Sequence, residues 1–127
     1  MSDKDVKDKL KEIKIENYIW CIYIGIIFMS WYANSLEEKY YVNKDIKSKN
    51  KYRNIMIIIF SVLVVIYLYF LIDAWESFKK INENTSQKKK ELLTLSLIAA
   101  FMIFISGLLF LYVTYKDNDL DVEVAFN

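Results

Sequence analysis

The side chains that most often carry out chemistry in proteins are scarce in this chain. It has no histidine, so the commonest metal ligand and general base is missing. Cys21 is the only cysteine, which excludes an internal disulfide and a cysteine-rich zinc or iron–sulfur site. Gly25 and Gly107 are the only glycines, and each stands alone in an apolar run rather than in a phosphate-binding loop. We therefore expect no catalytic residues, no bound metal and no cofactor.

Asp73 directly follows the second hydrophobic run, and Glu76 follows one helical turn later. A carboxylate inside a membrane would be a candidate for proton or cation transfer. Asp73 instead lies at the end of its run and precedes Trp75, a residue type that is common at membrane surfaces. We therefore interpret Asp73 as a membrane-boundary acid and expect it to pair with Lys79 or Lys80.

Three long stretches without a charged residue dominate the sequence, at residues 17–36, 54–72 and 92–115. Their 20, 19 and 24 residues correspond to about 30, 28 and 36 Å of α-helix, enough to cross a hydrocarbon core of ~30 Å. Lone strands would leave backbone groups without partners in lipid, so the spans must be helical. The predicted fold class is all-α: an integral membrane bundle of three transmembrane helices with helical extensions beyond the bilayer, in one domain over residues 1–127.

The segments outside the spans are charged. Residues 1–16 alternate lysine with acidic residues and carry a weak apolar stripe. They predict either a solvated extension of the first span or a helix lying on the membrane, and the balanced charge favours the extension. Residues 37–53 lack glycine and proline, so we expect a helical hairpin that turns near residues 44–50. A second turn is predicted at residues 82–86, inside a loop over residues 73–91.

Small residues within the spans predict where helices pack closely. They are Cys21 and Gly25 in the first span, and Ser96, Ala99, Ala100, Ser106 and Gly107 in the third. In lipid, small side chains let two helix backbones approach and gain dispersion contacts. Two interpretations remain open: packing within the bundle, or an interface to another subunit.

The acidic tail, residues 116–127, alternates apolar and polar side chains over its last eight positions. The apolar members are Leu120, Val122, Val124 and Phe126. A period of two is typical of a strand, which could join the edge of a partner's sheet. A disordered terminus is the other interpretation.

Positive charge differs slightly between the two sides of the predicted membrane protein. The N-terminus and second loop together carry ten lysines, whereas the first loop and tail carry six lysines and one arginine. The positive-inside rule therefore favours a cytoplasmic N-terminus. The glycosylation sequon that begins at Asn84 would then be cytoplasmic and unmodified.

The composition also indicates an AT-rich genome. Ile, Lys, Tyr, Asn, Phe and Met make up 65 of the 127 residues, whereas Gly, Ala, Arg and Pro make up 8. In this respect the chain resembles the small multi-span membrane proteins of large AT-rich DNA viruses, and equally those of AT-rich bacteria and protists. The resemblance is one of composition and carries over no functional residues. Which membrane the chain would occupy, viral or host, is left open.

These features favour a non-catalytic membrane protein that acts as a structural scaffold or as an accessory subunit of a membrane complex. The expected partners are the lipid bilayer and other membrane protein subunits or further copies of the chain. A formal net charge of +1 gives no reason to expect nucleic acid, and no motif indicates a small-molecule substrate. The alternative is a small homo-oligomeric channel, for which Ser61, Ser96 and Ser106 are polar residues within the spans.

Overall fold

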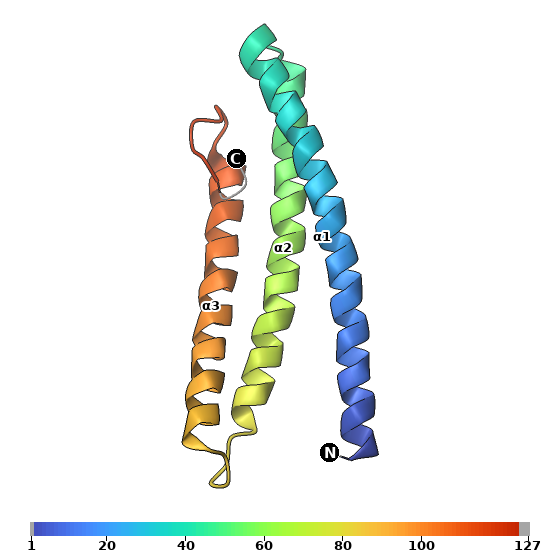
Figure 1. The fold of residues 1–127 in the computed structure, drawn as a ribbon. Coiled ribbons are helices and arrows are strands. Elements are labelled where there is room, and N and C mark those ends of the chain that lie inside the picture. Colours follow the sequence, from blue (N-terminus) through green and yellow to red (C-terminus); the bar gives the residue numbers. More distant parts are fainter. Residues whose placement is uncertain (1, 125–127) are drawn as a thin grey trace.

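The computed structural model describes residues 2–124, and these form three long α-helices (Figure 1). The helices are α1 (Asp3–Asn43), α2 (Ile46–Lys79) and α3 (Gln87–Lys116). Each is long enough and apolar enough to cross a membrane, so the predicted all-α fold with three spans is confirmed. The chain is a multi-pass membrane protein whose helices are longer than the uncharged runs.

Local hydrogen bonds explain where α1 begins. The Ser2 hydroxyl accepts from the Asp5 backbone N–H, and the Asp5 carboxylate accepts from the Ser2 backbone N–H, at 3.2 Å each. This reciprocal pair satisfies N–H groups that a helix start otherwise leaves without partners. From there α1 runs without a break to Asn43, so residues 3–16 extend the first span rather than forming a separate helix on the membrane.

The first turn consists of Lys44 and Asp45, at the start of the range 44–50 in which it was expected. Lys44 adopts a left-handed conformation with φ of 56°, and its N–H donates to the Tyr40 carbonyl. Asp45 then caps α2, because its carboxylate accepts from the Lys47 N–H at 3.1 Å and from the Ser48 hydroxyl at 2.8 Å. The second turn follows α2, and Ser86 caps α3 by accepting from the Lys89 N–H.

The helices lie in a row with α2 in the middle. Both α1 and α3 pack against α2, whereas α1 and α3 make no contact with each other over the described residues. In Figure 1, α1 crosses α2 near their shared turn and diverges from it toward the N-terminus. The predicted bundle is therefore an open row.

The hydrophobic core follows this arrangement and is concentrated on α2. Met56, Ile59 and Phe60 are the largest fully buried side chains. Ala33 of α1 is fully buried on one side of α2, and Phe110 of α3 stacks on Phe60 from the other, with ring centroids 5.8 Å apart. The core thus joins both pairs of helices in the half of the molecule that contains the first turn.

Candidate functional site

The boundary acid Asp73 lies on α2 and is half-buried. The ion pair expected with Lys79 is absent, because the Lys79 ammonium pairs with Glu76 at 3.2 Å, one turn apart on the same helix. Asp73 forms no salt bridge with Lys80 or any other described residue, and the charges that act on it are those of Glu12, Lys9 and Glu16 on α1 together with Lys80. The expected ion pair does not form within the described chain, and the sequence did not reveal that charged residues of α1 act on Asp73.

Two of the predicted packing residues face α2 from α3. Gly107 is buried, and a Cβ atom at this position would lie 2.9 Å from Cδ2 of Tyr67 and 3.4 Å from Cγ2 of Val64. Ala100, seven residues earlier on the same face, is half-buried. The missing side chain at Gly107 therefore allows α2 and α3 to approach, as the small-residue rule for membrane helices describes.

The remaining small residues lie on outer surfaces. Cys21, Gly25, Ser96, Ala99 and Ser106 are all exposed. A Cβ atom at Gly25 would have no heavy atom within 4 Å. The predicted set is thus divided: Gly107 and Ala100 lie in the packing of α3 on α2, and the other five residues, on α1 and α3, are exposed.

The strand expected in the tail does not form over residues 117–124. Leu120 adopts a left-handed φ of 57°, which breaks the alternation that the sequence pattern requires. The described tail folds back on the helices, where Leu120 and Val124 pack against the core and Val122 stays exposed. Phe126 lies outside the described residues. Contacts with distant residues, rather than the local alternation, determine the conformation of the described tail, and binding of the tail to a partner's sheet edge stays a prediction.

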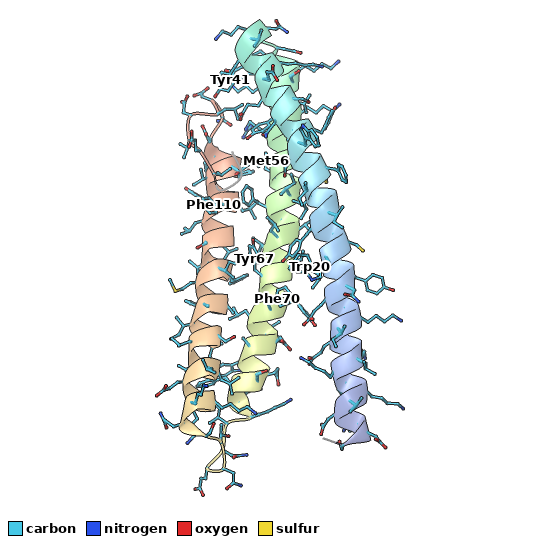
Figure 2. The ribbon with its side chains drawn as sticks, viewed as in Figure 1. Trp20, Tyr41, Met56, Tyr67, Phe70 and Phe110 are labelled. Carbon is cyan, nitrogen blue, oxygen red and sulfur yellow. The ribbon has the colours of Figure 1, made fainter. Side chains whose placement is uncertain are left out.

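Three side chains from the α1–α2 hairpin hold the tail in place. The Arg53 guanidinium donates to the carbonyl oxygens of Tyr115 and Asp117, at 2.9 and 3.1 Å. These carbonyls belong to the C-terminal end of α3, where a cation also compensates the helix dipole. The Tyr41 hydroxyl donates to the Leu120 carbonyl at 2.9 Å, and Lys49 pairs with an exposed Asp119 at 3.6 Å; Figure 2 shows Tyr41 beside the tail.

The carboxylate of Asp117 organises the tail internally. It accepts from the backbone N–H of Asp121 at 3.2 Å and of Val122 at 2.9 Å. Burial raises the pKa of Asp117, but hydrogen bonds from the N–H groups of Val122, Asp121 and Asp119 outweigh burial and leave the pKa below its ordinary value. The tail therefore stays folded with Asp117 ionised.

These contacts enclose a cavity of about 300 Å³ between the hairpin, the end of α3 and the tail, which we call the boundary cavity. Glu37 of α1, Arg53 of α2 and Thr114 of α3 line it together with Asp117 and residues 120–124. Thr114 is only 9% exposed, and its hydroxyl has no hydrogen-bond partner among the described residues. The cavity thus combines carboxylates, one guanidinium and a buried hydroxyl.

Sequence analysis missed this site. Arg53 is the only arginine and lies immediately before the second span, which was a usable signal, but its acceptors are more than 60 residues away along the chain. Over residues 2–124 there is no group of three or more His, Cys, Asp or Glu side chains that could hold a metal ion. No protein-family model, curated protein or solved structure matches the chain.

Proposed function

We propose that this chain is a non-catalytic integral membrane protein that serves as a structural scaffold or as an accessory subunit of a membrane complex. The open row supports the proposal most directly. Because α1 and α3 each pack only on α2 within the described chain, their outer faces are left to lipid or to other helices. In the most apolar 18-residue stretch of α3, only 6% of the residues are buried against the rest of the chain.

The outer face of α1 offers a place for a partner helix. A Cβ atom added at Gly25 would have no heavy atom of another helix within 4 Å, and the exposed Cys21 lies one turn earlier on α1. Apolar burial does not drive association between helices in lipid, so close backbone approach at small residues supplies the contact energy. A helix of another subunit, or of a second copy, would gain this contact at Gly25.

We place the N-terminus in the cytoplasm on the basis of the lysine excess, which puts the first turn, the boundary cavity and the tail on the opposite side. The sequon at Asn84 is exposed in the turn between α2 and α3. In a eukaryotic host, absence of glycan at Asn84 together with labelling of an Asn50→Cys variant, at an exposed position after the first turn, by a membrane-impermeant maleimide applied to the non-cytoplasmic side would fit this orientation. Glycan at Asn84 would contradict it.

The test of the proposal is purification of the tagged full chain from its native membrane in a mild detergent. Light scattering gives the mass of the complex, and mass spectrometry gives its components. A stoichiometric second protein that is lost in the Gly25→Leu variant and kept in a Phe28→Leu variant would support the accessory role. A monomer without a partner would contradict it.

One observation favours a homo-oligomeric channel as the second candidate. Ser96 and Ser106 are exposed on α3, so their hydroxyls can line a water-filled space when copies of α3 face one another. Ser61 is half-buried on α2 and is less accessible to such a space. A homogeneous homo-oligomer that conducts ions in reconstituted vesicles, with conductance altered by Ser106→Leu, would favour the channel over the accessory role.

A further inference from the structure

One side of α1 carries a stripe of residues with heptad spacing, which we call the outer stripe. Its positions alternate in steps of four and three residues, the spacing that brings side chains to one face of a helix in a coiled coil. The members are Val6, Leu10, Ile13, Asn17, Trp20, Ile24, Ile27 and Trp31. All of them are exposed, and all except Asn17 are apolar.

The outer stripe faces away from α2. Ile24 comes two residues before the buried Ile26, and Trp31 comes two residues before the buried Ala33. Two residues correspond to about 200° of rotation around a helix with ~3.6 residues per turn, so the stripe and the buried residues lie on opposite sides of α1. Over the described residues α1 contacts no helix except α2, which leaves the outer stripe uncovered.

Lipid accounts for the part of the stripe inside the membrane but not for its beginning. Val6, Leu10 and Ile13 precede the first uncharged run and are 43%, 59% and 42% exposed. Because α1 runs unbroken through Asn17, where that run begins, Leu10 lies about 10 Å and Val6 about 16 Å outside the run. Headgroups add only about 5–8 Å to each side of the hydrocarbon core, so these two side chains lie beyond them. In water, burial of such apolar surface favours association with another helix.

The charges beside the stripe indicate what such a helix would carry. In a coiled coil, the positions that flank the apolar seam form ion pairs across the interface. Outside the membrane these positions hold Lys7, Lys9, Lys14 and Glu16. Lys7 and Lys14 form no salt bridge with any described residue. Lys9 pairs with Glu12 at 3.5 Å on the exposed surface, where an ion pair contributes little to stability. Lysines on both flanks therefore favour a partner helix with acidic flanks.

A second copy of the chain fits this surface poorly. Two copies with the same orientation in the membrane would align their α1 helices in parallel. In a parallel pair, the last flanking position of one heptad meets the flanking position of the next heptad on the other helix. Lys9 of each copy would then lie beside Lys14 of the other, and like charges at an interface oppose association.

We infer that the outer stripe binds a helix of a different membrane subunit, which has apolar side chains at heptad spacing and acidic side chains beside them outside the membrane. The inference rests on the accessory role proposed above and gives the chemistry of the partner. Asn17 is the one polar member of the stripe and lies where α1 enters the membrane. A polar residue at such a seam position fixes the register of two helices. Gly25 is not part of the stripe, so the two contacts on α1 can be tested separately.

The first experiment treats native membranes that contain the tagged full chain with a carbodiimide, which joins a lysine to a carboxylate only where the two are in direct contact. Mass spectrometry then identifies the joined peptides. We expect Lys7 or Lys14 to be joined to an acidic residue of a different protein, in a segment with apolar heptad spacing that leads into a hydrophobic span. Absence of such a link, links only to another copy of the chain, or links to a segment without that spacing would overturn the inference.

Matched variants measure how much the stripe contributes to the complex, from the amount of the second protein that copurifies in mild detergent. Leu10→Gln should weaken the association about tenfold, which corresponds to exposing a leucine that the partner covers. Lys7→Gln combined with Lys14→Gln should weaken it about fivefold, because two surface ion pairs are lost. Lys4→Gln combined with Lys11→Gln removes the same charge from exposed positions on the other side of α1 and should leave the association unchanged.

The results separate this inference from the accessory role. A second protein that Leu10→Gln and the Lys7 and Lys14 double variant retain as fully as the control would contradict the inference alone. An unmodified chain that copurifies with no second protein would contradict both. All the substituted side chains are exposed within the chain, so circular dichroism of the purified variants should show unchanged helix content.

Discussion

The close approach of α3 to α2 at Gly107 predicts a specific response to a larger side chain. A Cβ atom there would lie 2.9 Å from Cδ2 of Tyr67, whereas nonbonded carbon atoms prefer about 3.5–4.0 Å. Gly107→Ala thus requires a shift of roughly 0.5–1 Å, and the gain of ~1 kcal/mol in helix propensity partly offsets it. Gly107→Leu adds three further carbons at the contact and should cost about 1–3 kcal/mol of unfolding free energy.

The assay is thermal unfolding of the purified chain in maltoside micelles, followed by circular dichroism and tryptophan fluorescence. A loss of this size lowers the Tm by about 4–12 °C for a chain of this length. Gly25→Leu is the matched control, because a Cβ atom there has no heavy atom of another helix within 4 Å, so the gain in helix propensity meets no clash and the Tm of the monomer should not fall. Equal losses in the two variants, or none at Gly107, would refute the packing argument.

Three further predictions concern the tail. Arg53→Gln removes charge-assisted hydrogen bonds to Tyr115 and Asp117 and should open the tail by about 1.5–3 kcal/mol, seen as faster amide exchange over residues 117–124; unchanged exchange would show that Arg53 does not hold it. Tyr41→Phe removes one bond to the Leu120 carbonyl, so its effect on the same exchange should be smaller, about 0.5–1.5 kcal/mol. Because the pKa of Asp117 is lowered on folding, its contribution is fully present above the unfolded pKa of ~3.9 and is lost as the pH falls through the lower folded value. Asp117→Asn at pH 7 should open the tail as acid does in the unmodified protein. If acid opens the tail of the Asp117→Asn variant by as much as that of the unmodified protein, another group is responsible and this assignment is contradicted.

The sequence was sufficient to predict the three helices, because each uncharged run has the length that a helix needs to cross a bilayer and only helices pair all their backbone groups there. It was insufficient to predict which face of each helix packs against its neighbour. Ala33 is fully buried and Ile27 is 63% exposed, yet both are apolar, because the outer face of a membrane helix must be apolar as well. Hydrophobic periodicity, which identifies the buried face of a helix in water, therefore carries little information here.

The tail shows the opposite situation, in which a clear local pattern was overridden. Alternating apolar and acidic residues predicted a strand, but the pattern contains no information about Arg53 or Tyr41, which bind the tail from 62 to 79 residues earlier in the chain. Once Arg53 holds the C-terminal carbonyls of α3, the Asp117 carboxylate is positioned to accept from the N–H groups of the following residues. The boundary cavity depends on the same contacts, so it could not be predicted from the sequence.

The row of helices also sets an order for biogenesis. Every helix contact joins neighbours in the sequence, α1 with α2 and α2 with α3, so each hairpin can form as soon as its second helix has entered the membrane. The bonds from Tyr41 and Arg53 to residues 115–120 span 62 to 79 residues, so they form only after both hairpins. During translation, residues that later line the cavity, such as Glu37, are therefore accessible to water until residues 115–124 leave the ribosome.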